Sequence, residues 1–516
     1  MRRDLSGLAH TAFDLLVVGA GIYGACAAWD AALRGLSVAL VDQDDFGAGT
    51  SANSLRIVHG GLRHLARGNL ARMRESIRER STLLRIAPGL VEPLPVLVPM
   101  YGMGSRGRLA LGAALTLNDL ASWARNQDLG PTRLIPRGRL VSRDECLRLF
   151  PWFAAESLTG GALWYDAQLL HPERLTLSFV QAAAARGAVA ANYVRVDRLR
   201  SRDGVVHGAR ATDRLTGGEF DIEARAVLVA AGPWTRDVIA AVSGAERPSV
   251  QAERALGLNL VIGRRLAEVA VGVRARSGRR EDPVGGGHRF LFFAPQGNAT
   301  LLGTWYTLAP VSEIGAARAL GARSLLEEFN DACPGLRLSP RDVVRCHWGW
   351  LPLKAGAEPG RPDALAERPR VVDHGRTNGL RHLISVEGVK YTTARCVAEQ
   401  AVDRVFRSLG KMGPPCRTAE QQLPVAQTTL SLKPGVGAAR EEIVRAVREE
   451  MAVTLSDIVF RRTALGAAPG PERAPVAEAA RVAAEELGWD SARQEAEIDA
   501  VMRHAGMPGP ALEAVG

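Results

Sequence analysis

A glycine-rich turn near the start of the chain constrains the fold more than any other feature. Gly19, Gly21 and Gly24 follow a short apolar run and precede an alanine-rich stretch that ends at Gly35. A second apolar run then leads to Asp42. This order predicts a strand, a tight turn, a helix and a second strand, which together form a βαβ unit.

The spacing of the same residues indicates a dinucleotide-binding site. In a G-x-G-x-x-G turn, the first glycine permits the tight turn and the second lets the backbone approach a pyrophosphate. The third lets the helix pack closely on the strand, and the helix N-terminus faces the phosphates. Asp42 lies where a carboxylate can accept both ribose hydroxyls, which favours FAD or NAD over NADP. No second glycine-rich fingerprint follows, so we expect one bound dinucleotide.

Composition excludes several classes of protein and argues against a nucleic-acid-binding protein. The 516-residue chain is 47% hydrophobic and 23% charged, which excludes a disordered or collagen-like chain. The net charge is +10, but only four of the 65 basic residues are lysines, and the charges are spread along the chain. No basic run with interleaved aromatic residues is present, so we expect no nucleic-acid partner.

Cysteines and hydropathy bear on the compartment. The six cysteines include no C-x-x-C pair, which argues against a disulfide framework or a zinc site, and we expect no metal. The basic start lacks an apolar signal core, and no run of about 18 uncharged apolar residues occurs. We expect a cytoplasmic protein, either free or peripheral on the cytoplasmic face of a membrane.

Periodicity divides the rest of the chain. Residues 72–86 and 109–125 read as amphipathic helices, and we interpret the apolar face of the second as packing against the core rather than lying on a bilayer. A strand-rich middle includes a hairpin whose turn is residues 295–298. The composition shifts near residues 414–424, and residues 440–516 show helical spacing, which indicates a separate helical domain.

Further segments carry a more specific pattern. Residues 45–51 read Asp-Phe-Gly-Ala-Gly-Thr-Ser, residues 56–64 contain His-Gly-Gly-Leu-Arg-His, and residues 388–395 read Gly-Val-Lys-Tyr-Thr-Thr-Ala-Arg. Together with residues 230–234 and 455–466, they resemble the FAD-dependent glycerol-3-phosphate dehydrogenase family, within the D-amino-acid-oxidase-like flavoproteins. The resemblance covers nearly the whole chain, in order.

The resemblance implies an α/β fold in which a Rossmann-like FAD-binding domain is interleaved with an antiparallel-sheet substrate domain. A C-terminal α-helical domain follows, at residues 425–516. The oxidoreductase region would span residues 12–413. Its FAD-binding parts would lie at about 12–90, 150–240 and 340–410, and its substrate parts at about 91–149 and 241–339.

The resemblance also implies a reaction. A hydride would pass from C2 of sn-glycerol 3-phosphate to N5 of FAD, which gives dihydroxyacetone phosphate. The electrons would pass to a quinone or, as in oxidase relatives, to dioxygen. Because the flavin carries the chemistry, the protein mainly supplies position and electrostatics.

The resemblance assigns roles to residues of the cofactor site. Thr50 and Ser51 would bind the FAD phosphates or the flavin edge, and Gly60 and Gly61 would let the backbone lie against the isoalloxazine ring. Gly232, Gly388 and Thr392 match further cofactor-contacting positions. His59 is a candidate general base for the C2 hydroxyl proton, with the alternative that it only orients its loop.

Substrate contacts are assigned in the same way. Arg63 matches an arginine that contacts the substrate, and a guanidinium suits a phosphate. His64 stands where relatives usually carry tyrosine. Lys390 is a lysine in an arginine-rich chain, and its compact charge suits the flavin N1–O2 edge or the substrate phosphate.

Two positions depart from the family pattern. Leu351 stands where an arginine is usual, and Asn259 stands where a histidine is usual. The candidates to compensate are His347 and either Arg368 or Arg370. These departures leave open an oxidoreductase that acts on a non-phosphorylated amine or 2-hydroxy acid, and a flavoprotein kept for binding or assembly with little turnover.

Overall fold

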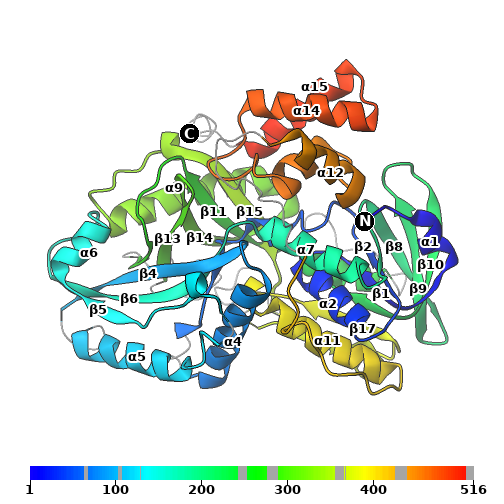
Figure 1. Cartoon of the computed structure of the whole chain (residues 1–516), viewed down its shortest axis with the longest axis horizontal. Helices are drawn as coiled ribbons and strands as arrows, with labels where there is room; N and C mark the ends of the chain where they lie inside the picture. Colours follow the sequence, from blue (N-terminus) through cyan, green and yellow to red (C-terminus); the bar gives the residue numbers. More distant parts are fainter. Residues whose placement is uncertain are drawn as a thin grey trace.

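The computed structural model describes residues 1–62, 68–102, 107–127, 129–241, 253–275, 289–354, 365–366, 368–424 and 438–506. Their strands form two sheets, and a group of helices close to the C-terminus forms a third part (Figure 1). The expected α/β class with a C-terminal helical domain is confirmed.

The glycine-rich turn lies in a βαβ unit, as its sequence predicts. The unit consists of β1 (Ala12–Val18), α2 (Ile22–Leu33) and β2 (Val38–Val41). The two strands are parallel, with Leu15 opposite Val38. Every residue of β2 is buried, as expected for a parallel strand covered on both faces.

The first sheet surrounds this unit. Its main order is β16-β17-β10-β1-β2-β7, and a hairpin of β8 and β9 extends from β10. The added strands are β16 (Arg370–Asp373), β17 (Leu383–Glu387), β10 (Glu219–Val229), β7 (Val189–Ala191), β8 (Val194–Arg202) and β9 (Val205–Asp213). Three helices, α2, α7 (Pro172–Ala184) and α11 (Ala394–Ser408), gather on one face (Figure 1) and share a hydrophobic core with it.

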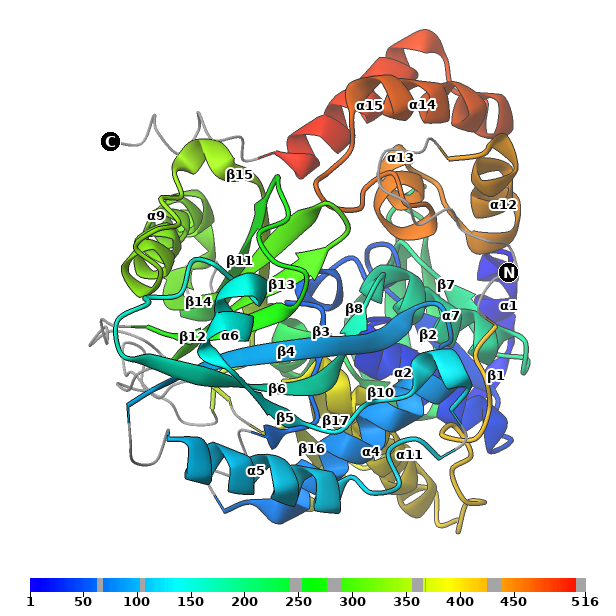
Figure 2. The same ribbon diagram turned by 60° about the vertical axis from the view of Figure 1, so that its left-hand side comes forward.

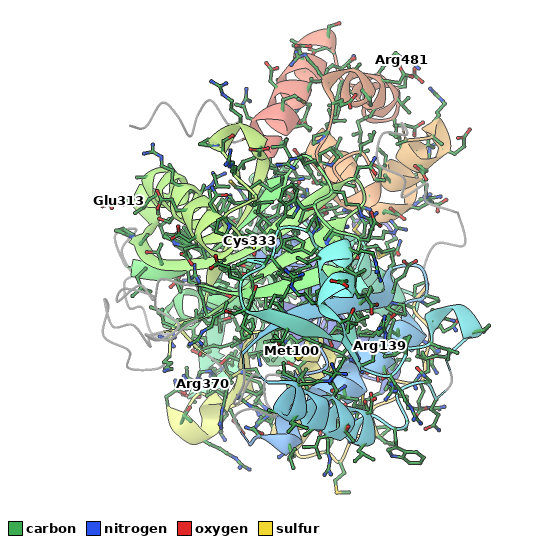
Figure 3. The ribbon with its side chains drawn as sticks, turned by 90° about the vertical axis from the view of Figure 1, so that its left-hand side faces the viewer. Met100, Arg139, Glu313, Cys333, Arg370 and Arg481 are labelled. Carbon is green, nitrogen blue, oxygen red and sulfur yellow. The ribbon has the colours of Figure 1, made fainter. Side chains whose placement is uncertain are left out.

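The second sheet is mostly antiparallel, with the order β15-β11-β14-β13-β12-β4-β6-β3, and β5 (Arg139–Val141) pairs with β6 (Figure 2). The strands are β15 (Val343–Leu351), β11 (Glu253–Ile262), β14 (Ala299–Pro310), β13 (Phe290–Gln296), β12 (Ala270–Arg274), β4 (Val91–Tyr101), β6 (Leu158–Leu169) and β3 (Ile57–Val58). The hairpin expected around residues 295–298 is confirmed by the pairing of β13 with β14. A core that includes Phe293, Phe329 and Cys333 lies between the sheet and α9 (Ile314–Ala332). Cys333 is labelled in Figure 3.

The division between the two sheets differs in three places from the division that the resemblance implies. β3, β6 and β15 belong to the second sheet, although residues 12–90, 150–240 and 340–410 were expected in the FAD-binding part. β6 pairs with β4 along nearly its whole length, and β15 pairs with β11. Such pairing joins strands that are distant in the sequence, so chain order does not reveal it.

Helix α4 (Leu70–Ile86) agrees with its amphipathic pattern and buries Met73 and Ile77. Helix α5 (Arg108–Ala121) does not agree with the expectation of core packing. Its apolar side chains Leu109, Leu117 and Leu120, and Trp123 just after it, are 90%, 51%, 66% and 85% exposed.

Only a small part of α5 contacts the sheet, which is why most of its apolar face is exposed. Leu115 is buried, and a Cβ at Gly138 would lie only 2.9 Å from its side chain. Hydrophobic periodicity identifies an apolar face of a helix but does not show how much of that face another element covers.

The C-terminal part has a core of its own, which includes Ile443, Leu455, Val476 and Val501. It comprises α12 (Arg440–Glu450), α13 (Leu455–Asp457), the π-helical turn η7 (Ile458–Arg462), α14 (Arg473–Leu487) and α15 (Ser491–Ala505). Figures 1 and 2 both place these helices at the end of the molecule opposite α5 and α11.

Replacing Gly24 tests the close packing of the βαβ unit. A Cβ at Gly24 would lie 1.8 Å from the carbonyl oxygen of Gly19. We expect Gly24→Ala to lower the free energy of unfolding by about 3 kcal/mol in urea, because backbone atoms would have to move apart. Gly315→Ala is the control, since its Cβ meets nothing within 4 Å; there we expect no loss of stability. Equal stabilities of the two variants would contradict the inferred contact.

Candidate functional site

A cavity of about 350 Å³ opens where β1 and β2 end and α2 begins. Its wall also includes residues of β8 and of the turn that follows β10. Ligands of open α/β sheets bind at such carboxyl ends of strands. The cavity wall brings together six of the residues expected at the cofactor site, namely Gly19, Gly21, Asp42, Thr50, Ser51 and Gly232.

The glycine turn leaves room for a phosphate group at the start of α2. Gly19 has φ +98°, and a Cβ there would lie 2.8 Å from the carbonyl oxygen of Ala230. Gly24 packs against Gly19, so the helix and the turn approach without intervening side chains. Gly21 is the N-cap and has no side chain to occupy this space. The donors and positive dipole end of α2 therefore face the cavity, as a pyrophosphate requires.

Asp42 is oriented for a ribose by the backbone around it. Its carboxylate accepts hydrogen bonds from the N–H groups of Ala20 (2.6 Å) and Asp44 (3.0 Å). Burial raises the pKa of Asp42 to about 7, although both N–H groups favour the ionised form. An acceptor pair held in this way fits the two hydroxyls of an unmodified adenosine ribose.

Thr50 and Ser51 fix the far wall of the cavity. The Thr50 hydroxyl donates to the carbonyl oxygen of Trp350 on β15 (2.8 Å), which links the loop to the second sheet. The Ser51 hydroxyl oxygen accepts the N–H of Ile22 at the start of α2 (3.0 Å). Ser51 can therefore satisfy a helix donor and still donate its own hydrogen to a phosphate.

Sequence reasoning missed several residues of the cavity wall. Val194 and Val196 of β8 line it, and the Val194 N–H donates to the carbonyl oxygen of Asp42 (2.7 Å). Arg254 of β11 also lines the cavity, and its guanidinium donates a hydrogen bond to the carbonyl oxygen of Pro233 (2.9 Å). The β-branched run around residue 194 was visible in the sequence. Its position beside the ribose site depends on the folding of β8 over β2, which no local motif encodes.

Tyr23 is another missed residue, and it holds the segment that carries Lys390. The Tyr23 hydroxyl donates to the carbonyl oxygen of Lys390 (2.7 Å) and accepts the N–H groups of Val389 and Lys390, both at 3.1 Å. A Cβ at Gly388 would lie 2.1 Å from the Tyr23 ring. Burial raises the pKa of Tyr23, so its hydroxyl remains protonated. Thr392, in η6 (Tyr391–Thr393), is 2% exposed.

The turn after β3 is held by a buried ion pair. The Gly60 N–H donates to Asp166 (2.6 Å), and Arg80 donates to the same carboxylate oxygen (3.1 Å). A Cβ at Gly60 would lie 2.4 Å from the Arg80 guanidinium, and Gly61 has φ +79°. His59, next to this turn, is partly buried.

Only some of the predicted site residues line the cavity. Within the described part of the chain, the cavity wall includes neither the His59–Gly61 turn nor Gly388, Lys390 and Thr392. Tyr23 joins the Lys390 segment to the wall. Gly24 packs behind the wall. Arg63 and His64 lie outside the described residues.

The two positions that depart from the family pattern carry no charge. Asn259 donates to the carbonyl oxygen of Asn53 (3.1 Å) and accepts the Thr304 hydroxyl (2.7 Å). Leu351 is the last residue of β15. Its side chain lies against Gly257 of β11, where an added Cβ would be 3.1 Å from it.

The candidates to compensate do not place a cation beside them. His347 lies opposite Asn259 in the strand pairing, but burial, followed by the charge of Arg345, holds the pKa of His347 well below its usual value. His347 is therefore uncharged at neutral pH. Arg370 lies on β16 of the first sheet and pairs with Glu387 (3.5 Å), and Arg368 is exposed.

Two models of known protein families match this chain, and one of them describes FAD-dependent enzymes. The family model described as FAD dependent oxidoreductase matches residues 14–404. A second model, described as the C-terminal domain of alpha-glycerophosphate oxidase, matches residues 386–494.

Individual proteins are similar over the same span. A glycerol-3-phosphate dehydrogenase of Synechocystis sp. is 31% identical over 90% of each chain, and glycerol-3-phosphate dehydrogenase 1 of Mycobacterium tuberculosis is 30% identical over 92% of this chain and 96% of its own. The crystal structure of a Bacillus halodurans glycerol-3-phosphate dehydrogenase complexed with FAD has the same fold, with a TM-score of 0.71, 23% identity and coverage of 98% and 97%. The chain therefore belongs to the FAD-dependent oxidoreductase family, and its cofactor is FAD.

Proposed function

We propose that the protein oxidises sn-glycerol 3-phosphate at C2 to dihydroxyacetone phosphate, with FAD as the hydride acceptor. One observation carries this proposal: relatives named glycerol-3-phosphate dehydrogenase match both the FAD-binding region and the C-terminal domain of this chain. When bound, FAD supplies an electrophilic N5 that accepts the hydride. The chain supplies the groups that orient the substrate and manage its charge.

We assign the central electrostatic role to Lys390. Three hydrogen bonds between the Tyr23 hydroxyl and the backbone of Val389 and Lys390 fix the segment from which the Lys390 ammonium extends. A preorganised cation stabilises charge that develops on reduction, or binds the substrate phosphate. His59 is our candidate for accepting the C2 hydroxyl proton, and Arg63 and His64 for contacts with the phosphate.

Replacing Lys390 tests this role. We expect Lys390→Ala to lower kcat/KM for glycerol 3-phosphate by about 100-fold, because a fixed cation is lost from the site. Lys411→Ala is the matched control, since Lys411 is a half-exposed lysine whose nearest carboxylate is 4.0 Å away. Steady-state kinetics with an artificial electron acceptor measures both variants. A kcat/KM of Lys390→Ala within twofold of wild type would remove Lys390 from the site.

A second candidate function is oxidation of a non-phosphorylated amine or 2-hydroxy acid. The observation in its favour is that Asn259 and Leu351 are uncharged and that His347, opposite Asn259, is neutral. A site with fewer cations binds a phosphate dianion less tightly.

Anaerobic mixing of the FAD-loaded protein with candidate substrates separates these functions. We expect glycerol 3-phosphate to bleach the flavin absorption, because its C2 hydride reduces the cofactor. Bleaching only by an amine or a 2-hydroxy acid would favour the second candidate. Bleaching by none would indicate a flavoprotein kept for binding or assembly.

Leu351→Arg adds the missing cation. If Leu351 borders the phosphate, we expect KM for glycerol 3-phosphate to fall about tenfold, with no change for glycerol. Val344→Arg is the control, because Val344 is exposed on the same strand. Equal effects of the two arginines would place Leu351 outside the substrate site.

We propose that the electrons pass to a membrane quinone, with dioxygen as the alternative acceptor, and that the protein works at the cytoplasmic face of the membrane. No helix in the described ranges is long and apolar enough to cross a bilayer, so contact would be peripheral. The exposed stripe of Leu109, Leu117, Leu120 and Trp123 on and just after α5 has the character of an interfacial helix. Helix α11 lies at the same end of the molecule as α5 (Figures 1 and 2). A groove between β16 and α11 is lined by Arg370, Arg376, Arg404 and Arg407, whose charges suit anionic headgroups.

Vesicle sedimentation tests the membrane contact. We expect the protein to sediment with phosphatidylcholine vesicles that contain phosphatidylglycerol. A Leu117→Gln, Leu120→Gln, Trp123→Gln variant should lower the bound fraction at least about fivefold, because it removes apolar burial. Leu320→Gln, an exposed leucine of α9, is the control and should bind as wild type does. Wild-type protein that stays in the supernatant at low salt would exclude this contact.

A further inference from the structure

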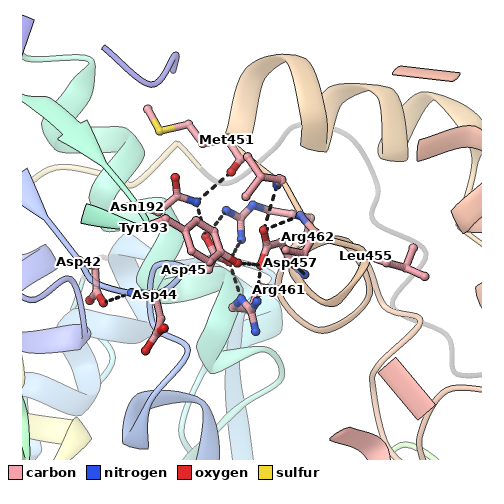
Figure 4. A network of polar contacts seen from close by, with 12 residues as sticks. Asp42, Asp44, Asp45, Asn192, Tyr193, Met451, Leu455, Asp457, Arg461 and Arg462 are labelled. Atoms are coloured by element: carbon pink, nitrogen blue, oxygen red, sulfur yellow. Dashed lines mark hydrogen bonds and ion pairs between the residues drawn. The ribbon is translucent and has the colours of Figure 1, made fainter. Parts of the chain in front are cut away.

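A carboxylate of the FAD-binding region is fully buried and pairs with two arginines of the C-terminal domain. Asp45 follows the ribose-binding Asp42 by three residues, and its side chain has no exposed surface. It accepts hydrogen bonds from both terminal nitrogens of Arg462 (2.7 and 2.8 Å), from Arg461 Nε and from the Asn192 amide (2.9 Å). Figure 4 shows the two arginines reaching this carboxylate from η7.

The two sides of the segment 42–51 have different partners. Asp42, Gln43, Asp44 and residues 47–51 line the cofactor cavity, whereas Asp45 does not line it. The front of the segment therefore faces the cofactor cavity, and its back is bound to the C-terminal domain.

A second set of hydrogen bonds also joins the segment 42–51 to the C-terminal domain, through Tyr193. The Tyr193 N–H donates to the carbonyl oxygen of Asp44 (3.1 Å), and its hydroxyl donates to Asp457 of α13 (2.8 Å). Arg461 also donates to Asp457 (2.6 Å), so Asp457 joins both sets. The Asn192 amide extends the first set to the carbonyl oxygen of Met451 (2.9 Å).

The charges in this cluster depend on one another. Burial by itself would raise the pKa of Asp45, but the guanidinium groups of Arg462 and Arg461 outweigh it and hold that pKa below its usual range. Removing either side leaves a buried charge without its partner, which is strongly unfavourable. The docked C-terminal domain therefore supplies the bonds that hold the back of the segment at Asp45.

We infer that Arg461 and Arg462 of the C-terminal domain are positioning residues of the FAD site, which act through Asp45 on the segment 42–51. The C-terminal domain is then a determinant of FAD affinity. Because coupling between sites is reciprocal, bound FAD also favours docking of the C-terminal domain.

The test compares FAD dissociation constants of apoprotein variants, measured by the quenching of flavin fluorescence. We expect Asp45→Asn and Arg462→Gln each to raise the FAD dissociation constant at least about tenfold. Arg462→Lys keeps the charge but not the paired geometry, and should recover part of the affinity. At saturating FAD, kcat should stay within about twofold of wild type. The substitutions move the segment 42–51, which binds the dinucleotide, and do not move the groups around the reacting atoms.

A matched control separates positioning from general loss of stability. Glu450→Gln removes a buried ion pair with Arg174 (2.6 Å) across the same interface. It keeps the backbone carbonyl to which Arg462 donates, and its side chain does not contact the segment 42–51. We expect it to lower the melting temperature about as much as Arg462→Gln but to leave the FAD dissociation constant unchanged.

Two results would overturn the inference. One is unchanged FAD affinity in both Asp45→Asn and Arg462→Gln. The other is an equal loss of FAD affinity in Glu450→Gln. If Asp45→Asn does not fold, Arg461→Lys provides the same comparison, because Arg461 keeps Asp457 as a partner.

Discussion

The approach of α2 to the turn before it is the constraint on which the cofactor site depends. The Cα of Gly24 lies so close to the Gly19 backbone that no side chain fits between them, and Gly19 in turn lies against Ala230 at the end of β10. Three backbone segments therefore meet at one point. This contact aims the N-terminus of α2 at the cavity and leaves it free to face an anion.

Around this point, the site is assembled from segments that belong to different parts of the molecule. The Thr50 hydroxyl donates to a carbonyl of the second sheet, Tyr23 holds the Lys390 segment, and Asp45 pairs with two arginines of η7 in the C-terminal domain. Each of these links fixes a segment of the site by a bond to another part of the molecule, and the link at Asp45 does so from the side that does not line the cavity. A dinucleotide site built in this way is preorganised by its supporting contacts as well as by the residues that line it.

Much of the fold could be predicted from the sequence, where short-range patterns carry the information. The βαβ unit, the hairpin at residues 295–298, the helix at Leu70–Ile86 and the C-terminal helices follow from periodicity and turn residues. Other features could not be predicted, because they depend on which elements become neighbours. The sheet membership of β6 and β15 and the exposure of α5 are of this kind.

For this protein, the sequence by itself determined the dinucleotide turn, with Gly19, Gly21, Gly24 and Asp42, because backbone geometry and ribose chemistry require those residue types at that spacing. It also determined the family, through motifs spread over the whole chain. Only the tertiary structure decided that Tyr23 supports Lys390, that His347 is buried and neutral, and that Arg461 and Arg462 reach Asp45. These relationships join residues far apart in the chain, and burial, which sets their charges and strengths, exists only once the chain is folded.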